Sequence, residues 1–437
     1  MFTSTETIYQ IYLKHPHVFT DTRQLVVGGI FFALKGDNFD GNQYAKDALA
    51  KGASYAVVDD QHVALDERYL LVEDVLLSLQ DMARQHRKTF EFPVIALTGS
   101  NGKTTTKELI ARVLSMKYNT YATKGNFNNH IGVPLTLLSI LPNKHEMAVI
   151  EMGANHQDEI ALLCTIALPT HGLITNIGKA HLEGFGGMKG ILKGKGELFD
   201  FLSKKKGIVF VNTHQDNVME MVSKRRAFGE IVFYRTSNSN VNPELVQAAP
   251  QVIYKTNAGK TIHTQLPGSY NFDNMCAAMA IGKHFDVTEE DIHEAIGTYL
   301  PDNNRSQFIT KGTNRILLDA YNANPSSMKA ALESFAALPA DRKIVILGDM
   351  FELGTESDAE HLALGEFIAA QSFDLVILSG ALMQKALPAL PKAYYFPDKF
   401  SLHNWVMDNP QTNTHFLIKG SRGMALETII GIMPDGL

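Results

Sequence analysis

Residues 94–106 read VIALTGSNGKTTT, a short apolar run followed directly by a turn rich in glycine and threonine. The apolar run predicts a buried strand over 94–98, and the turn predicts a helix that begins at Lys103. Gly99 and Gly102 let backbone N–H groups face an anion, which the positive end of the following helix also attracts. We expect an exposed Lys103 that reaches the terminal phosphates of a nucleotide, and a Thr104 hydroxyl that can ligate magnesium. The alternative is a glycine turn that merely caps a core helix.

Strands alternate with helices on both sides of this loop. Downstream, the apolar pattern predicts a helix over 103–116 and strands over 147–151, 173–176 and 208–211. After PDNNRSQF a second series of alternating strands and helices begins, with strands expected over 315–319, 343–347, 375–378 and 415–418. The first part of the chain has shorter strands, over 30–34, 55–58 and 69–72, and helices over 44–51 and 76–87. Near-continuous apolar strands separated by helices are typical of mainly parallel sheets covered on both faces.

The fold class is therefore α/β, and the pattern predicts three domains. We expect a small α/β domain over 1–90 and a central P-loop ATPase domain with a mainly parallel sheet over 91–305. Residues 306–437 should form a Rossmann-like doubly wound domain.

Composition excludes several classes of protein. The formal net charge of −6 over 437 residues argues against binding of nucleic acid through phosphate contacts. Apolar runs have the length of strands, so no membrane insertion is expected. The start of the chain lacks a basic segment followed by an apolar core, and only Cys164 and Cys276 occur. We expect a cytoplasmic protein that acts as a monomer.

Polar residues follow the later strands at the same sheet edge as the phosphate loop. Glu151 ends the strand over 147–151, where a carboxylate close to Thr104 can hold the magnesium of a nucleotide. His181 lies in a glycine-rich loop, and Lys193 and Lys195 lie at an expected helix start. Two cations there conflict with the helix dipole unless an anion is near. The alternative for each of these residues is a solvated position on the surface.

Further motifs follow the loop in order: KGNFNNHIGVPLTLL (124–138), EMGANH (151–156), TNIGKAHLEGFG (175–186), KGELF (195–199), DAYNANPSSM (319–328), ILGDMFELG (346–354) and KGSRGMALE (419–427). Together they resemble the Mur ligases, ATP-dependent amide-forming enzymes of peptidoglycan synthesis. Residues 21–58 resemble the UDP-binding domain of that family. Within the family, the chain is most similar to the members that add D-alanyl-D-alanine, because the D-N-P-R motif of the diaminopimelate- or lysine-adding members is absent.

The resemblance implies roles in binding ATP and magnesium. The triphosphate would be held by the loop residues Gly99, Ser100, Asn101, Gly102, Lys103, Thr104 and Thr105. Asn274 would contact adenine, Asp319 would bind the ribose, and Arg305 would neutralise the transferring phosphate. One magnesium would be ligated by Thr104 and Glu151. A second would be held with help from His181 and bridged by a carbamylated Lys195, with Lys193 as the fallback. The catalytic set would be Lys103, Lys195, His181 and Arg305.

The resemblance also implies the other two substrates, UDP-MurNAc-tripeptide and D-alanyl-D-alanine. Candidate contacts to them are Thr22, Arg23, Lys35, Asp40, Asn126, Asn129, Asn322 and Asn324. The first domain departs from the family pattern, because Thr22 stands where serine is common and Asn42 where histidine is common. The alternatives are another Mur ligase, a folylpolyglutamate-synthase-like ligase, and a P-loop kinase or ATPase.

Overall fold

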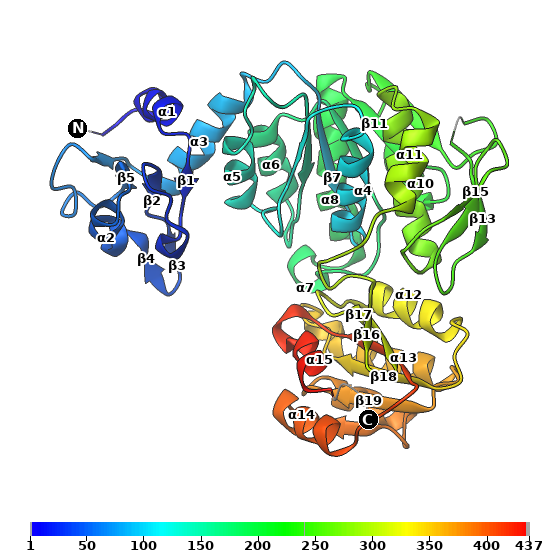
Figure 1. The fold of residues 1–437 in the computed structure, drawn as a ribbon. Coiled ribbons are helices and arrows are strands. Elements are labelled where there is room, and N and C mark those ends of the chain that lie inside the picture. The colour runs from blue at the N-terminus through cyan, green and yellow to red at the C-terminus, as the bar shows by residue number, and fades with distance from the viewer. Residues whose placement is uncertain (1, 240, 434–437) are drawn as a thin grey trace.

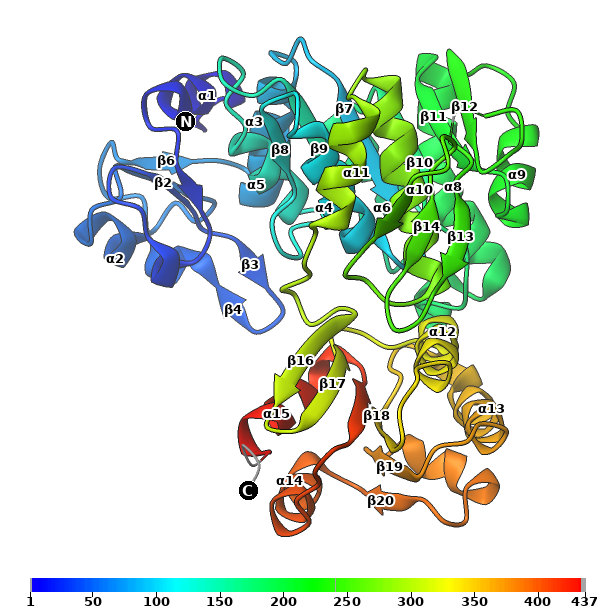
Figure 2. The same cartoon turned by 45° about the vertical axis from the view of Figure 1, so that its right-hand side comes forward.

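The computed structural model describes residues 2–239 and 241–433, and three regions of it each contain a main parallel sheet (Figures 1 and 2). The N-terminal region has a four-stranded parallel sheet in the order β1 (Val18–Phe19), β2 (Ile30–Phe32), β5 (Tyr55–Val58), β6 (Tyr69–Leu71). The helices α1 (Thr5–Lys14) and α2 (Ala45–Ala50) and the hairpin of β3 (Lys35–Gly36) and β4 (Phe39–Asp40) complete this region.

Helix α3 (Val75–Arg87) joins the N-terminal region to the central one. It begins at Asp74, whose carboxylate accepts a hydrogen bond from the Leu77 N–H. Toward its end, Arg84 donates to the Thr165 carbonyl and Arg87 to the Ala167 carbonyl, each through Nε. These bonds fix the helix against the central region, beside α5 (Gly132–Leu138) and α6 (Glu159–Ala167).

The central region is built on a six-stranded, entirely parallel sheet, as the sequence predicts. Its order is β12 (Glu230–Tyr234), β11 (Ile208–Asn212), β10 (His171–Ile174), β7 (Val94–Thr98), β9 (Met147–Glu151), β8 (Thr120–Ala122). Side chains of β7 alternate between two apolar clusters: Val94 and Ala96 pack in one, and Ile95 and Leu97 in the other. The sheet is therefore buried on both faces.

Helices cover both faces of this sheet (Figure 1). The first face packs against α5, α6 and α8 (Met188–Lys205), and the second against α4 (Lys103–Leu114), α10 (Ser269–His284) and α11 (Glu289–Gly297). The short helices α7 (Leu182–Phe185) and α9 (Asp216–Ser223) lie in connections. A three-stranded antiparallel sheet, β13 (Glu244–Gln247), β14 (Ile253–Lys255) and β15 (Thr261–His263), was not predicted.

The predicted strand over 173–176 is wrong by two residues, because β10 runs from His171 to Ile174. The next two residues leave the sheet to hold the phosphate loop. Thr175 donates to the Asn101 carbonyl over 2.7 Å, and the Asn176 side chain accepts from the Asn101 N–H over 3.0 Å.

The C-terminal region has a second six-stranded sheet in which only β16 is antiparallel. The order is β16 (Gln307–Lys311), β17 (Asn314–Asp319), β21 (His415–Lys419), β18 (Lys343–Gly348), β19 (Leu375–Ser379), β20 (Tyr394–Phe396). Its helices are α12 (Pro325–Ala336), α13 (Ser357–Ala369), α14 (Lys399–Asp408) and α15 (Ile429–Ile432). Within the described ranges, no helix has the length and apolar character needed to cross a membrane.

Candidate functional site

A cavity of about 730 Å³ lies between the central and C-terminal regions. The phosphate loop forms one wall, and the ends of β17 and β21 contribute to the opposite wall. The predicted site residues that line it are Ser100, Asn101, Gly102, Lys103, Thr105, Asn129, Glu151, His181, Asn274, Arg305, Asp319, Asn322 and Asn324. The structure thus gathers most of the predicted nucleotide-binding residues around one space.

Two glycines of the loop are required by its shape. Gly99 has φ of 148° and Gly102 has φ of 77°, and an added Cβ would lie 2.0 Å from Thr175 Oγ1 and 2.6 Å from Asn274 Oδ1, respectively. Ser100 holds the loop further by donating to the Gly178 carbonyl over 2.9 Å. The Ser100 and Asn101 N–H groups both donate to Asn176, so an anion would be met by the N–H groups at the start of α4.

Lys103 lies differently from the expected exposed position. Its side chain is half-buried, and its ammonium folds back to donate to the Gly99 carbonyl over 2.8 Å. Burial lowers the pKa of Lys103, with Glu151 opposing this shift and Arg305 adding to it. The expectation of an exposed lysine is wrong, because the Gly99 carbonyl accepts the hydrogen bond that water would accept from an exposed ammonium.

Thr104 and Glu151 meet below the loop. The Thr104 hydroxyl donates to Glu151 Oε1 over 3.2 Å, and Asn128 Nδ2 donates to the same oxygen over 2.8 Å. The other carboxylate oxygen, Oε2, is buried and has no hydrogen-bond partner among the described residues. The Lys107 ammonium lies 4.0 Å from it. A buried carboxylate oxygen without a hydrogen bond, beside a hydroxyl, fits a magnesium ion that takes its remaining ligands from phosphates and water. Sequence reasoning missed Asn128, although it lies in the quoted KGNFNNH motif.

His181 lines the cavity but pairs with the C-terminal region. Its Nδ1 contacts the Glu352 carboxylate, and this bond is the main cause of the lowered pKa of Glu352. Across residues 2–239 and 241–433, no three or more His, Cys, Asp or Glu side chains gather in a way that could hold a metal ion. A metal near His181 would therefore depend on other ligands.

Lys195 is fully buried, whereas Lys193 is exposed. The Lys195 ammonium donates to the Ala154 carbonyl over 3.1 Å and lies 4.8 Å from the centre of the Phe185 ring. Burial first, and then the charge of Lys103, holds the pKa of Lys195 well below its ordinary value. The prediction that these lysines start a helix is wrong, because α8 already begins at Met188, after the positive-φ Gly187.

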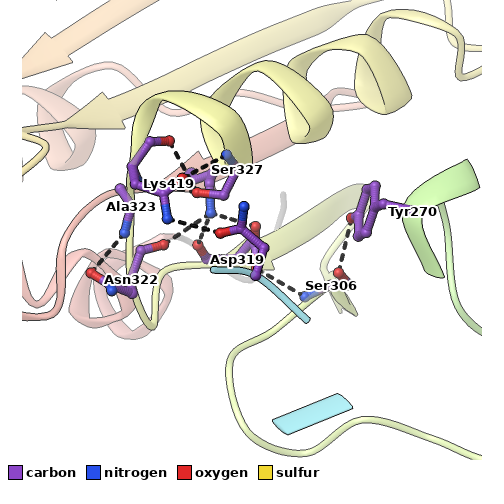
Figure 3. A network of polar contacts seen from close by, with 9 residues as sticks. Tyr270, Ser306, Asp319, Asn322, Ala323, Ser327 and Lys419 are labelled. Carbon is purple, nitrogen blue, oxygen red and sulfur yellow. Dashed lines mark hydrogen bonds and ion pairs between the residues drawn. The ribbon is translucent and has the colours of Figure 1, made fainter. Parts of the chain in front are cut away.

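Asp319 and Lys419 form the centre of the polar network on the C-terminal wall (Figure 3). The Lys419 ammonium, which is 2% exposed, lies 2.6 Å from the Asp319 carboxylate and also donates to the Asn322 carbonyl over 2.9 Å. The Ser306 N–H donates to Asp319 over 3.2 Å, and the Ser306 and Tyr270 hydroxyls lie 2.9 Å apart. Sequence reasoning missed Lys419. It follows the predicted strand 415–418, and the sheet-edge argument used for Glu151 would have found it.

Asn274 and Asn324 contact the loop from two other elements. Asn274 Oδ1, on α10, accepts from the Thr106 hydroxyl over 3.0 Å, which places the amide beside Gly102. Asn324, before α12, donates to Asn101 Oδ1 over 2.8 Å. Both amides therefore touch the phosphate-loop segment, although they are far from it in sequence.

Gly99, Thr104 and Lys195 are buried behind the residues that line the cavity. The other predicted residues that do not line it, in the described part of the chain, are Thr22, Arg23, Lys35, Asp40 and Asn126. Lys35 pairs with Asp59 over 2.8 Å, and Asn42 bridges Asp40 and Asp59 with bonds of 2.8 and 2.7 Å. This polar group marks one end of the N-terminal sheet. Asn126 is exposed.

Comparison with protein families covers most of the chain. The Mur ligase family, catalytic domain, matches residues 16–87; the Mur ligase middle domain matches 97–282; and the Mur ligase, glutamate ligase domain, matches 304–422. The segments between the matches contain the start of β7, and α11 with the connection that follows it.

Individual proteins agree with the family matches. The chain is 36% identical to the UDP-N-acetylmuramoyl-tripeptide–D-alanyl-D-alanine ligase of Escherichia coli (strain K12), covering 96% of this chain and 93% of that protein. It is 34% identical to the protein of the same name from Bacillus subtilis (strain 168), covering 94% and 92%. A crystal structure of MurF from Acinetobacter baumannii superposes with a TM-score of 0.84 at 32% identity, covering 95% and 92%.

The resemblance seen in the motifs is confirmed by these matches, and the three regions, the phosphate loop and the cavity beside it agree with them. The chain belongs to the Mur ligase family of ATP-dependent amide ligases.

Proposed function

We propose that this chain joins D-alanyl-D-alanine to UDP-MurNAc-tripeptide in cytoplasmic peptidoglycan precursor synthesis. The observation that carries the proposal is a single cavity in which the phosphate loop faces Arg305 and Asp319. Such a space can hold a triphosphate and its ribose together. The choice of substrates is supported by the names of relatives that match over more than nine tenths of the chain.

The proposed reaction activates a carboxylate. The terminal carboxylate of the tripeptide attacks the γ-phosphorus of ATP, which forms an acyl phosphate and releases ADP. The amine of D-alanyl-D-alanine then attacks the carbonyl carbon, loses a proton, and expels inorganic phosphate as the amide bond forms. Such transfers need alignment and neutralised charge more than covalent participation of the protein.

Residues of this chain can supply both requirements. The loop amides and Lys103 would hold the phosphates, and the Arg305 guanidinium would face them from the other wall. Thr104 and Glu151 would hold a magnesium ion, which adds positive charge when bound. Asp319, fixed by Lys419, would accept hydrogen bonds from the ribose.

The proposal also includes a carbamate on the Lys195 side chain. A neutral lysine amine adds to carbon dioxide and releases a proton, and the buried environment of Lys195 favours the neutral amine. The product is anionic and provides oxygen ligands to a cation. Lys193 is exposed and lacks this environment, so it is the poorer candidate.

The N-terminal region would bind the uridine diphosphate. The polar group around Lys35, Asp40 and Asn42 lies at the carboxyl ends of β2 and β5, where ligands of α/β sheets commonly bind. The cavity also reaches Gln80 of α3 and Asn129, on the side from which the peptide would enter. Asn126 remains a proposed contact of that peptide.

The test measures phosphate release with UDP-MurNAc-tripeptide and ATP, in the presence and absence of D-alanyl-D-alanine, with product identification by mass. Sustained release should require the dipeptide and should match amide formation. Equal release without the dipeptide would support a simple ATPase, and a stable phosphorylated product would support a kinase. Amide formation with glutamate and a folate in place of these substrates would support the folylpolyglutamate alternative.

A further inference from the structure

Arg305 lies in the segment 298–306, which connects α11 to β16 and so joins the central and C-terminal regions. Its guanidinium carbon lies 3.7 Å from the centre of the Tyr321 ring, on the cavity wall. Its Nε is buried and has no hydrogen-bond partner among the described residues. The guanidinium therefore takes its direction from the backbone of the segment and from the ring beside it.

The backbone around Arg305 is held in an unfavourable conformation. Asn304 has φ of 57° and Ser306 has φ of 48°, and side chains other than glycine rarely adopt this left-handed region. Such residues persist where the surrounding contacts determine the conformation. On the C-terminal side these contacts are the bonds of Ser306 to Asp319 and Tyr270.

On the N-terminal side, the contacts converge on the carboxylate of Glu108. Asn303 Nδ2 donates to both of its oxygens, over 3.0 and 2.9 Å, and the Tyr299 hydroxyl donates to Oε2. Burial, and then the Glu108 charge, raises the pKa of Tyr299, so the hydroxyl stays protonated as a donor. One carboxylate thus fixes the segment at two points before Arg305.

Glu108 belongs to α4, the helix that begins with Lys103. The neighbouring Lys107 ammonium, which is 2% exposed, lies 3.6 Å from the Glu108 carboxylate and 4.0 Å from that of Glu151. The helix that follows the phosphate loop therefore also anchors the segment that carries Arg305. The two sides of the nucleotide site are tied through this helix.

We propose that Glu108 is a positioning residue, which holds the segment 298–306 so that Arg305 faces the phosphate loop. This inference rests on the proposed function for the role of Arg305 in phosphate transfer. Glu108 acts on the reaction through Asn303 and Tyr299, without contacting substrate.

The same helix offers a matched control. Arg112 Nη2 donates to the Thr298 hydroxyl over 2.9 Å, at the far end of the segment and on the surface. Arg112→Ala removes one tie between the same two elements and leaves the contacts next to Arg305 in place. It should leave kcat unchanged.

The first experiment is a double-mutant cycle on kcat for ligation. Glu108→Ala should lower kcat by about 30-fold with Arg305 present, because small displacements of a positioned group cost up to about 100-fold. With Arg305→Ala, the same change should cost less than about 3-fold, because the group that it positions is gone. Equal factors in the two backgrounds, or a loss of activity in Arg112→Ala as large as in Glu108→Ala, would overturn the proposal.

The second experiment measures amide hydrogen exchange in peptides that cover 298–306, and it needs no ligation. The N–H groups of Tyr299, Asn304 and Ser306 are bonded in the folded chain. They should exchange faster in Glu108→Ala than in the wild type or in Arg112→Ala. Glu108→Gln, which keeps an acceptor for Tyr299 and Asn303, should exchange and turn over at rates near those of the wild type.

Asn303→Ala removes one of the two ties from the other side and leaves the Tyr299 bond, so it should raise exchange less than Glu108→Ala. It replaces Glu108→Ala if that variant does not fold. Unchanged exchange in these variants would overturn the proposal. If the wild type formed no amide from D-alanyl-D-alanine, the proposed function would fail. The exchange comparison would still decide whether Glu108 holds the segment.

Discussion

The two walls of the cavity are built in different ways. The phosphate loop occupies consecutive residues, 99–105, and its bonds to Thr175 and Asn176, which directly follow β10, lie within the central region. The facing wall takes Arg305, Asp319 and Asn324 from consecutive elements of the chain, and Lys419 from a strand 100 residues beyond Asp319. The conformation of the first wall is fixed by contacts within the central region. The position of the second wall depends on how the C-terminal region packs and how it docks on the central region.

Several polar contacts hold the walls at their separation, in addition to the bonds of Glu108 to Asn303 and Tyr299 and the bond of the Lys179 N–H to Ser326. Asn324 reaches Asn101, Glu352 contacts His181, and Lys179 pairs with Glu360. Each of these contacts joins a central loop to the C-terminal region. We therefore expect substitutions in the loop wall, and of Arg305, to act on the chemical step directly. Substitutions elsewhere in the facing wall should act on nucleotide affinity, stability or domain docking.

Lys103→Ala should have the largest effect, because it removes the phosphate contact that the loop ammonium would make on leaving the Gly99 carbonyl. Loss of such a contact costs about 3–4 kcal/mol in the barrier, or a fall in kcat on the order of 1000-fold. The exposed Lys204 of α8 supplies the control, since Lys204→Ala changes the same residue type away from the cavity. Steady-state kinetics and thermal unfolding should show lost activity with retained fold. Near-normal turnover would remove the loop from the mechanism.

Lys195→Ala should follow, with a loss on the order of 100-fold if a carbamate supplies metal ligands there. Formate or acetate should restore part of the activity, because a small carboxylate can occupy the place of the carbamate. Lys193→Ala is the matched control and should show neither the loss nor the rescue, since its side chain is exposed. Full activity of Lys195→Ala, or rescue only in the Lys193 variant, would reject the assignment.

The loop wall could be predicted from sequence because local rules define it. The strand over 94–98, the helix start at Lys103 and the parallel order of the central sheet all agree with the structure. Glu151 was placed at the correct strand end, because parallel strands bring their carboxyl ends to one edge. The positions of these elements follow from three local features of the sequence: the glycines of the turn, the apolar pattern of the strands, and the direction in which the chain runs.

Tertiary contacts account for what the sequence did not show. The pairing of His181 with Glu352 joins groups that no local pattern relates. Glu108 resembles an ordinary exposed acid on an amphipathic helix until Asn303 and Tyr299 come against it. The antiparallel sheet β13–β15 was missed because its strands are short and partly exposed.

Lys419→Met tests the buried pair of the facing wall. Removing the ammonium leaves the Asp319 carboxylate without its partner, and breaking a buried pair costs about 3 kcal/mol in the free energy of unfolding. The KM for ATP should also rise, because Asp319 loses its orientation. Lys385→Met, which removes a surface pair with Asp358, should cost no more than about 1 kcal/mol. Denaturant unfolding compares them, and equal losses would contradict the structural role of the buried pair.

Substitutions of Asn324 should have the smallest effects. Two of them distinguish the contribution of this residue to contact between the walls from its contribution to the stability of α12. Its side chain caps α12 by accepting from the Ser327 N–H over 2.9 Å, while its Nδ2 donates to Asn101 across the cavity. Asn324→Ser keeps a capping oxygen but is too short to reach Asn101, so it should retain stability and raise the KM for ATP about 5-fold, the equivalent of one hydrogen bond.

Asn324→Ala loses both contacts and should raise the KM equally while lowering the free energy of unfolding by about 1 kcal/mol. Thermal unfolding and ATP kinetics, measured on both variants, distinguish the two roles. A serine variant with unchanged KM would show that the bond between the walls does not contribute to nucleotide binding. The separation of the walls would then depend on the His181 and Lys179 contacts, which join the same two regions.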